Sequence, residues 1–437
     1  MGRFVAFHCR ACGERTPPEP APRFACPGCG FEALDVELDL AAIRRTVTPA
    51  LIGARRDPSL WRYRELLPVA MPRDDEGPLR QVGGTPLYSS PRASARIGGA
   101  RVHIKDDGRL PTGSLKDRAS AVVAMRAREL GVDCILAAST GNAGVAIAAM
   151  AQAAGMRAIV LVPAAAPPAK IAQLMLFGAR LLLVRGTYDD AFRLSREASR
   201  ELGLYCRNTG YNPFTVEGKK TVSFEICEQL TQQAARADSD PSRAELSAPD
   251  APPSKWLAPD RVYVSVGDGN IIVGVAKGFA DLLALGFIER MPRLFGVQSA
   301  GSAAIANAWR QGSEHIERVS SNTLADSISA DMPSDGLRAL RAVRDSGGDY
   351  LVVSDSAILS AIVELARDAT VFAEPAAATA YAGLLHHAQE SAIPPSEDVV
   401  VLVTGTGLKD VAAATRAVAA APTTIDPSMS ALRQALS

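Results

Sequence analysis

One lysine at the start of a predicted helix is the strongest candidate for covalent chemistry in this sequence. Residues 111–118 read Pro-Thr-Gly-Ser-Leu-Lys-Asp-Arg, and residues 119–130 then place apolar side chains at a helical period. The pattern predicts Ser114 as the N-cap and Lys116 in the first turn. Because a helix N-terminus carries partial positive charge, the free amine that a Schiff base requires is easier to reach there. Taken alone, such a lysine is more often a solvated surface residue.

A second polar loop has the composition of an anion site. Residues 139–144 read Ser-Thr-Gly-Asn-Ala-Gly and lie between a short apolar strand and an alanine-rich helix. Backbone N–H groups and the hydroxyls of Ser139 and Thr140 converge there, where the carboxylate of an amino acid can bind. Asn142 adds an amide that can reach a ring oxygen. Ordinary strand-to-helix turns look similar, so this loop indicates an anion site only in combination with the other loops of the chain.

Two further turns follow strands in the C-terminal half of the chain. Residues 267–270 read Gly-Asp-Gly-Asn between a predicted strand, 261–266, and a predicted helix, 271–285. Glycines let the backbone approach a phosphate, whose charge the helix N–H groups meet. The spacing of these glycines is not that of a dinucleotide-binding turn, and we expect Asp268 to turn its side chain away from the phosphate. Thr404 follows the last strand, where a hydroxyl can face a neutral pyridine nitrogen.

Alternating strands and helices are expected to position these loops. Strands are predicted at 102–105, 134–138, 157–163, 180–184, 294–298, 350–353 and 399–403, and helices at 143–154, 170–177, 188–202, 355–368 and 376–387. This rhythm indicates an α/β fold with a parallel sheet. Residues 217–221 resemble the end of a phosphate-binding P-loop, but Pro213 stands where that loop needs glycine. We therefore predict an ordinary amphipathic helix at 217–230.

Composition excludes several classes of function. The chain has 437 residues, of which 47% are hydrophobic, and its length allows two or three domains. Lysine plus arginine equals aspartate plus glutamate, at 47 each, so no net field attracts nucleic acid or anionic lipid. No apolar run follows the N-terminus, and the most apolar window, 134–155, is interrupted by polar residues. The sequence predicts a cytoplasmic protein with no nucleic-acid or membrane partner.

Four of the seven cysteines form two closely spaced pairs, each followed by glycine. They are Cys9, Cys12, Cys26 and Cys29. Two such knuckles can present four thiolates tetrahedrally to zinc and fold a segment too small for its own core. We predict a zinc-ribbon-like segment with a structural Zn²⁺; the alternative is a ribbon that has lost its metal. The remaining cysteines are predicted to be buried, inert thiols.

Two other segments stand out by composition. Residues 41–72 carry six arginines around Trp61 and Tyr63, and we interpret them as a solvated face rather than an anion site. Residues 231–255 hold hardly any large apolar side chain, which predicts a flexible insertion.

Five motifs of the chain match a known family in order. They are Gly-x-Thr-Pro-Leu, Pro-Thr-Gly-Ser-Leu-Lys-Asp-Arg, Ser-Thr-Gly-Asn-Ala-Gly, Val-Gly-Asp-Gly-Asn and Thr-Gly-x-Gly-Leu-Lys-Asp. Together they resemble the threonine synthase branch of the fold-type II, tryptophan synthase β-like, pyridoxal-phosphate enzymes. The likeness runs from the cysteine pairs to Asp410, leaving out the insertion. It implies pyridoxal 5′-phosphate as cofactor, a small amino acid as substrate and a homodimer, in which the 41–72 segment could pack across the interface.

The resemblance also implies how the chain is divided. It implies two three-layer α/β/α domains with the cofactor between them, plus the small N-terminal ribbon. The expected parts are the ribbon-like segment at 1–40, the arm and first part of the large cofactor domain at 41–115, a smaller α/β domain at 116–230, the flexible insertion at 231–256, and the rest of the large domain at 257–437.

The same resemblance assigns roles to individual residues. It implies that Lys116 forms the Schiff base and moves protons, that Asn142 bonds the ring hydroxyl, and that Thr404 faces the ring nitrogen. The substrate carboxylate would be held by Ser139, Thr140, Asn142 and Ala143, and the cofactor phosphate by Gly267, Asp268, Gly269, Asn270 and Ile271. The implied reaction is a lyase reaction. Phosphate is eliminated from Cγ of O-phospho-L-homoserine, and water adds at Cβ to give L-threonine.

Four positions depart from the family pattern, and one of them is Leu115, which stands where phenylalanine is common. Leu110 stands where asparagine is common, Gly83 where glutamate is usual, and Thr215 where an arginine suited to the substrate phosphate is frequent. The main alternative is therefore a related enzyme that performs β-elimination or β-replacement on a serine-, phosphoserine- or threonine-like amino acid, such as a dehydratase or a diaminopropionate- or cysteate-type synthase. A third hypothesis is a non-catalytic cofactor-binding or interaction protein.

Overall fold

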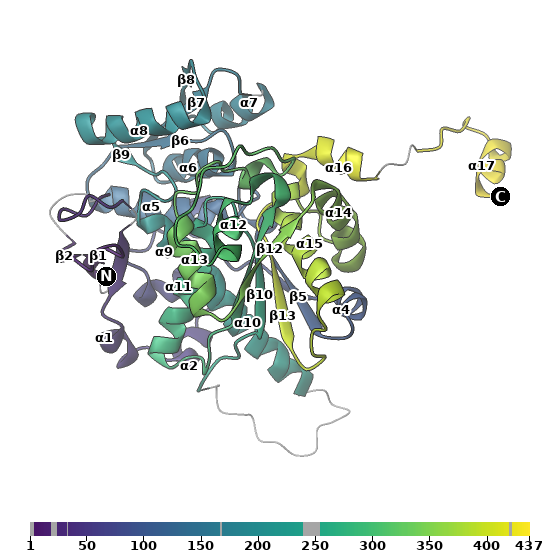
Figure 1. Ribbon diagram of the computed structural model, residues 1–437, viewed down its shortest axis with the longest axis horizontal. Helices are drawn as coiled ribbons and strands as arrows, with labels where there is room; N and C mark the ends of the chain where they lie inside the picture. The colour runs from purple at the N-terminus through teal and green to yellow at the C-terminus, as the bar shows by residue number, and fades with distance from the viewer. Residues whose placement is uncertain (1–3, 19–23, 33, 167, 239–253, 419–421) are drawn as a thin grey trace.

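The computed structural model describes residues 4–18, 24–32, 34–166, 168–238, 254–418 and 422–437 (Figure 1). Its strands are β1 (Phe4–His8), β2 (Arg15–Thr16), β3 (Asp35–Leu38), β4 (Leu87–Ser89), β5 (Arg101–Asp106), β6 (Cys134–Ala138), β7 (Arg157–Pro163), β8 (Arg180–Val184), β9 (Tyr205–Cys206), β10 (Arg261–Ser265), β11 (Arg293–Ser299), β12 (Asp349–Val353) and β13 (Asp398–Val403). Its α-helices are α1 (Leu40–Arg44), α2 (Pro49–Gly53), α3 (Gly77–Arg80), α4 (Pro91–Arg96), α5 (Lys116–Glu129), α6 (Asn142–Ala153), α7 (Pro168–Leu176), α8 (Tyr188–Leu202), α9 (Phe214–Lys219), α10 (Thr221–Asp238), α11 (Asn270–Leu285), α12 (Ala304–Arg310), α13 (Gly336–Asp345), α14 (Asp355–Ala369), α15 (Pro375–Glu390), α16 (Val411–Val418) and α17 (Met429–Leu436). Short 3₁₀ turns lie at Leu60–Leu66, Asp107–Arg109, Ala300–Ser302, Asp326–Ile328 and Gly407–Lys409.

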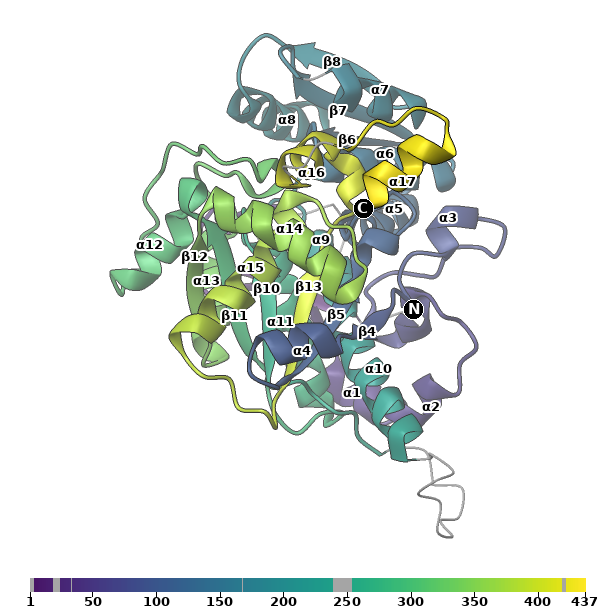
Figure 2. The same cartoon turned by 90° about the vertical axis from the view of Figure 1, so that its right-hand side faces the viewer.

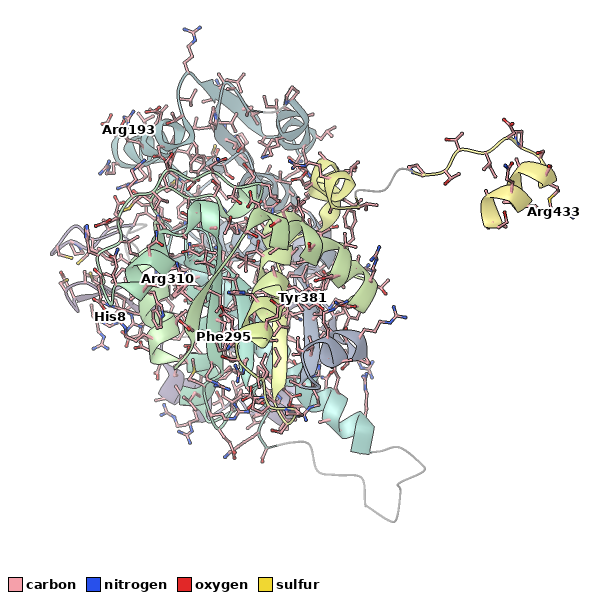
Figure 3. The ribbon with its side chains drawn as sticks, turned by 45° about the vertical axis from the view of Figure 1, so that its right-hand side comes forward. His8, Arg193, Phe295, Arg310, Tyr381 and Arg433 are labelled. Atoms are coloured by element: carbon pink, nitrogen blue, oxygen red, sulfur yellow. The ribbon has the colours of Figure 1, made fainter. Side chains whose placement is uncertain are left out.

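The larger sheet is parallel except at one edge. Its strand order is β12-β11-β10-β13-β5-β4, and only β4 runs antiparallel to its neighbour. Successive side chains of its central strands enter two different cores, as alternation along a buried strand requires. On β10, Val262 and Val264 join the core under α11 and α13, whereas Tyr263 joins the core under α15. Figure 3 shows Phe295 and Tyr381, which both belong to this second core. Helices therefore cover both faces of the sheet.

The smaller sheet has the order β8-β7-β6-β9 and is parallel throughout. Ile135 and Ala137 of β6 pack in the core that contains α6, while Leu136 and Ala138 pack with Ala191 of α8. Figures 1 and 2 show this sheet at one end of the molecule, beyond the larger one. The predicted α/β architecture with three-layer packing is confirmed.

The arm at 41–72 packs on the core of its own chain. Trp61 and Tyr63 are buried, and the Tyr63 hydroxyl donates a hydrogen bond to Glu228 at 2.5 Å. Arg62 pairs with the same carboxylate at 2.6 Å. The solvated-face prediction holds for the exposed Arg44, Arg45, Arg56 and Arg64, but it is wrong for the aromatic part of the segment.

The single amphipathic helix predicted at 217–230 is wrong in two respects. The chain forms α9 and α10, which divide at Lys220, and nearly every side chain from Phe214 to Leu230 is buried. Charged residues are buried with them, because ion pairs such as Lys220 Nζ to Asp281 Oδ2, at 2.8 Å, replace water. The charged residues of this segment therefore led to the wrong prediction of a helix side that faces solvent.

The predicted insertion is shorter than its composition indicated. Helix α10 continues through Asp238, and Trp256 is buried against Phe287, with ring centroids 5.5 Å apart. The part from 239 to 253 lies outside the described residues. At the C-terminus, α17 projects away from the body in Figures 1 and 3. None of the described helices combines the length and apolarity that crossing a membrane requires.

Candidate active site

The loop before Lys116 is fastened to the turn that follows β13. The Leu115 N–H donates to the carbonyl of Thr404 at 2.9 Å, and the Thr406 N–H donates to the carbonyl of Gly113 at 3.0 Å. Gly113 has a φ of +77°, and a Cβ there would lie 2.8 Å from the Thr406 side chain. Helix α5 starts at Lys116 with Leu115 as its N-cap, so the prediction of Ser114 as N-cap is wrong. Ser114 instead forms a β-bridge to Gly405 in this fastening.

The two residues after the lysine lock the start of α5. Asp117 accepts hydrogen bonds from the backbone and hydroxyl of Thr112, at 2.7 and 2.5 Å. Arg118 is fully buried and binds two carboxylates, Asp107 at 2.7 Å and Glu225 at 2.6 Å. The sequence Lys-Asp-Arg therefore couples a reactive position to two anchors, one on the preceding loop and one on α10.

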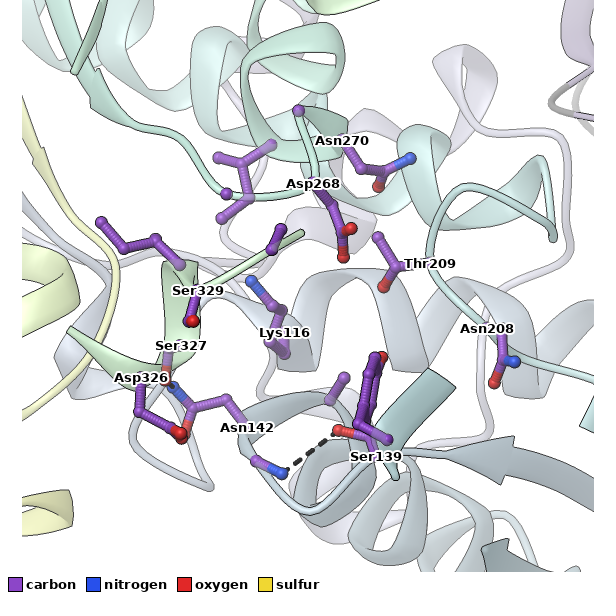
Figure 4. A pocket seen from close by; sticks show the side chains of 18 of the residues that line it. Lys116, Ser139, Asn142, Asn208, Thr209, Asp268, Asn270, Asp326, Ser327 and Ser329 are labelled. Atoms are coloured by element: carbon purple, nitrogen blue, oxygen red, sulfur yellow. Dashed lines mark hydrogen bonds between the residues drawn. The ribbon is translucent and has the colours of Figure 1, made fainter. Parts of the chain in front are cut away.

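The predicted loops converge on one cavity of about 530 Å³ between the two sheets. Figure 4 shows Lys116 at its centre, with Ser139 and Asn142 on one side and Asp268 and Asn270 on the other. The sequence-predicted residues that line it are Lys116, Ser139, Thr140, Asn142, Ala143, Gly267, Asp268, Gly269, Asn270 and Ile271. Each loop follows the carboxyl end of a parallel strand, the usual place for ligands in such sheets. Thr404 is not among the residues that line the cavity.

The amine of Lys116 is poised to lose its proton. Burial, reinforced by the charge of Arg207, lowers its pKa from 10.5 to about 8, although Glu374 and Asp268 oppose the shift. Within the described part of the chain, the amine has no hydrogen-bond or ion-pair partner. A desolvated lysine with a lowered pKa is suited to nucleophilic and proton-transfer chemistry.

Asn142 is oriented by a carboxyl group that the sequence analysis missed. Its side-chain amide donates to Glu374 Oε1 at 2.8 Å. Burial raises the pKa of Glu374 to about 7, against the opposing charges of Lys409 and Lys116. Glu374 is the residue before α15 and its Pro375, so its place ahead of a helix start was the available signal.

The turn at 267–270 leaves its backbone exposed to the cavity. A Cβ on Gly267 would lie 2.7 Å from the Cα of Ile328, so no other residue fits without a shift. Gly269 has a φ of +89° and directly precedes α11, whose first N–H groups have no intrahelical partner. The Asp268 side chain points into the cavity in Figure 4 and accepts a hydrogen bond from the Ser334 N–H at 3.4 Å; its direction relative to a bound phosphate stays a prediction. Burial raises the pKa of this carboxyl group, and the backbone N–H of Ser334 and the charge of Lys116 oppose the shift.

Two further cations line the cavity and were also missed. Lys219 on α9 bonds to Asn270 of the turn, and burial lowers its pKa well below 10.5. Arg207 follows the two-residue strand β9, which is too short to show a period in the sequence. The available signal was its position at the carboxyl end of a parallel strand.

The family departures at positions 83, 110 and 215 do not line this cavity. Leu110 is buried in the core, and the Thr215 hydroxyl is bonded to the carbonyl of Asn212 at 2.8 Å. Gly83 has a φ of +99°, and a Cβ there would lie 2.3 Å from the backbone of Leu60. Packing of the arm therefore requires glycine at 83.

The four paired cysteines form a separate cluster. The Sγ atoms of Cys9, Cys12, Cys26 and Cys29 all lie within 4.8 Å of one another. Zinc held by four thiolates at about 2.3 Å requires sulfur separations of about 3.8 Å, so the cluster fits such an ion. Gly13 and Gly30, with φ of +79° and +71°, close the two knuckles.

A buried polar chain connects this ribbon to the 267–270 turn. Asp35 of β3 binds Arg338, which also binds Asp335 at 3.1 Å. Asp335 accepts a hydrogen bond from Asn270, which in turn accepts one from Lys219. All five side chains are at most 9% exposed, so each needs its neighbours as hydrogen-bond or ion-pair partners.

Comparison with known proteins places this geometry in a family. Residues 79–405 match the model of a protein family described as "Pyridoxal-phosphate dependent enzyme". A threonine synthase from Methanocaldococcus jannaschii is 35% identical over 407 residues, covering 92% of this chain and 93% of that protein. A threonine synthase from Synechocystis is 34% identical over 377 residues, covering 85% and 90%. The chain belongs to the threonine synthase family of pyridoxal-phosphate dependent enzymes.

Solved structures with this fold agree with the assignment to fold-type II. The processed form of threonine deaminase isoform 2 from Solanum lycopersicum aligns with a TM-score of 0.61 at 22% identity, covering 76% of this enzyme and 82% of that chain. A fungal L-serine ammonia-lyase from Rhizomucor miehei aligns with a TM-score of 0.62 at 22% identity, covering 76% and 96%. At this identity the likeness shows the fold alone.

The enzyme's cavity fits the cofactor of its family. It contains the half-buried Lys116, whose amine has a lowered pKa and can react with an aldehyde. It also contains the turn at 267–270 ahead of a helix, where Gly267 and Gly269 leave the backbone room to approach a phosphate. These protein groups therefore suit a ligand that carries both an aldehyde and a phosphate.

Proposed function

We propose that this enzyme uses pyridoxal 5′-phosphate to convert O-phospho-L-homoserine to L-threonine. The observation that carries the proposal is one cavity lined by Lys116, by the polar loop at 139–143 and by the glycine-containing turn at 267–270. Relatives named threonine synthase that align over most of the chain support the choice of reaction. When bound, the cofactor supplies an electron sink for negative charge on the substrate.

The cofactor would be held by four groups of this chain. Lys116 would bond its aldehyde, Asn142 its ring hydroxyl, and the backbone from Gly267 to Ile271 its phosphate. Lys219 is bonded to that turn and would place its amine beside the phosphate as a hydrogen-bond donor. We retain Thr404 as the partner of the ring nitrogen on the basis of the family resemblance.

The other residues would bind the substrate and move protons. Ser139, Thr140 and Ala143 hold the substrate carboxylate through hydroxyls and N–H groups at the start of α6. The Lys116 amine removes the proton at Cα and then one at Cβ, which its lowered pKa permits near neutral pH. Glu374 keeps the Asn142 amide oriented. Phosphate leaves from Cγ, a proton is returned to Cγ to give the methyl group, and water adds its hydroxyl at Cβ while Cα regains a proton.

We also propose a structural Zn²⁺ at the four-cysteine cluster, whose sulfur spacing supports it. A homodimer and a cytoplasmic location stay predictions, drawn from the family resemblance and the composition.

The reaction can be tested with purified holoenzyme and three substrates. O-phospho-L-homoserine should release phosphate and L-threonine in equal amounts. O-phospho-L-serine and L-serine should release little keto acid. Turnover of the serine compounds alone would refute the proposed reaction and favour the β-eliminating alternative.

A further inference from the structure

The 267–270 turn is held from behind by Asp335, the residue before helix α13. The Asp335 N–H donates to the carbonyl of Asp268 at 2.9 Å, and its side chain accepts a hydrogen bond from Nδ2 of Asn270. Because an ionised carboxylate only accepts, it draws the amide nitrogen of Asn270 toward itself, which leaves the amide oxygen for the Lys219 amine that donates to it. The side chains of Asp335, Asn270 and Lys219 are at most 2% exposed. Asp335 therefore fixes the direction of the Asn270 amide in the turn.

Arg338 divides its guanidinium between two carboxylates. Its Nη1 donates to Oδ1 of Asp335 at 3.1 Å, and its Nη2 donates to Asp35 of β3. The other oxygen of Asp335, Oδ2, is the one that accepts from Asn270. If Asp35 moved away, the free Nη2 would turn to Asp335 Oδ2, since a guanidinium and a carboxylate favour two parallel hydrogen bonds. Arg338 would then compete with Asn270 for the same oxygen.

Asp35 takes its position from the cysteine ribbon. It stands opposite His8 where β3 pairs with β1, and β1 leads into the first cysteine knuckle. Arg10, which lies between Cys9 and Cys12 inside that knuckle, also binds the Asp35 carboxylate. A metal at the four cysteines would order the knuckle and both of these contacts, because a segment this small depends on its metal for a fixed fold.

We propose that Asp35, Arg338 and Asp335 are positioning residues for the cofactor phosphate, and that metal in the ribbon raises cofactor affinity through this relay. The three residues are not among those that line the cavity, so they act on it through Asn270, which is. The inference rests on the proposed cofactor and the proposed Zn²⁺. Because coupling between two binding sites is reciprocal, bound cofactor should also tighten metal binding by the same factor.

The test compares full-length wild type, Asp35→Asn, Asp35→Glu and Glu37→Gln. Glu37 is the matched control, because it lies on the same strand but binds Arg15 of β2, at 2.8 Å. The dissociation constant of pyridoxal 5′-phosphate is measured by absorbance titration of zinc-loaded protein. We expect Asp35→Asn to weaken binding by about 5- to 50-fold, within the range typical of coupled sites. Asp35→Glu retains the charge and should lose less, and Glu37→Gln should stay within about twofold, because an exposed ion pair contributes little.

Removing the metal with a chelator supplies a second arm that the wild type alone can answer. The wild type and Glu37→Gln should lose cofactor affinity by about 5- to 50-fold and recover it when zinc is added back. Asp35→Asn should change by less than about threefold, because its relay is already broken and the two effects are not additive. Phosphorus NMR of the bound cofactor should show a shifted resonance in Asp35→Asn but not in Glu37→Gln, which separates positioning of the phosphate from general destabilisation.

The outcomes separate the relay, the metal and the proposed reaction. Equal cofactor affinity in wild type and Asp35→Asn would overturn the relay, as would equal effects of metal removal on both proteins. Where Asp35→Asn does not fold, unchanged cofactor affinity of the wild type after metal removal overturns it. A wild type that binds no zinc, with affinity still lost in Asp35→Asn, would overturn the role of the metal but retain the positioning residues. Turnover of serine compounds alone would refute the proposed reaction and leave these binding results as they are.

Discussion

Replacing Glu225 with glutamine tests whether buried charge balance holds the lysine-bearing helix in place. Glu225 of α10 is 2% exposed and binds Lys105 at 2.6 Å and Arg118 at 2.6 Å. With Asp107, the cluster has two cations and two carboxylates. Glutamine keeps the shape but leaves two buried cations with one carboxylate. Breaking such a buried pair costs about 3–5 kcal/mol.

The pKa of Glu225 gives a second value for the contribution of this carboxylate to the free energy of unfolding. Burial opposes its ionisation, but Arg118 and Lys105 outweigh burial and lower the pKa from 4.5 to about 2. This shift corresponds to about 3 kcal/mol. Because the folded-state pKa is lowered, the stabilisation is present above pH 4.5 and is lost as pH falls through about 2. The Glu225→Gln variant should lack this acid-dependent loss.

Urea unfolding of the wild type and variants, from pH 7 to 3, measures both effects. The matched control is Glu314→Gln, whose carboxylate also binds two arginines but is 42% exposed, so it should change the midpoint little. The double variant Lys105→Met with Glu225→Gln restores one cation to one carboxylate and should recover at least half of the loss. A midpoint for Glu225→Gln no lower than that of the control would refute the reasoning, as would a double variant less stable than the single one.

Three further outcomes are expected. Cofactor loading of the apoenzyme should accelerate as pH rises through about 8, because Lys116 must lose its proton; absorbance after rapid mixing measures this, and a flat profile would contradict the lowered pKa. Gly269→Ala should weaken cofactor binding and lower the melting temperature more than Gly347→Ala, since both have positive φ but only a Cβ at 269 meets neighbouring atoms, the nearest at 2.7 Å. Metal analysis should find one zinc per chain, absent in Cys26→Ser and retained in Cys134→Ser; a metal-free wild type would count against the zinc site.

Periodicity predicted most of the elements because the strands of both sheets are short continuous apolar runs. The strands at 134–138, 157–163 and 180–184 have the predicted bounds, as does the helix Tyr188–Leu202. The loops that line the cavity could be found because each one follows such a strand. For these loops, the local sequence pattern of a strand followed by a turn also marks the position of the loop in the folded chain.

The residues that were missed share a different cause. Lys219 and Glu374 are charged, and a charged residue in a sequence window indicates solvent unless its partner is known. Their partners, Asn270 and Asn142, lie 51 and 232 positions away along the chain. No short-range pattern encodes contacts over such distances. The same holds for Ser114, whose role in the bridge to Gly405 depends on a turn nearly 300 residues later.

The ribbon has a physical reason to be part of this enzyme, although it lies outside the cavity. Arg338 is buried between Asp35 and Asp335, and Asp335 accepts a hydrogen bond from the Asn270 amide of the 267–270 turn. Without Asp35, the guanidinium would share the Asp335 carboxylate alone, and both groups could shift toward a new balance. Because a segment with two knuckles cannot hold β3 rigidly by its own apolar core, a metal at the cysteines would fix the strand that carries Asp35. A shift of the ribbon would therefore be transmitted to the 267–270 turn through the side chains of Asp35, Arg338, Asp335 and Asn270.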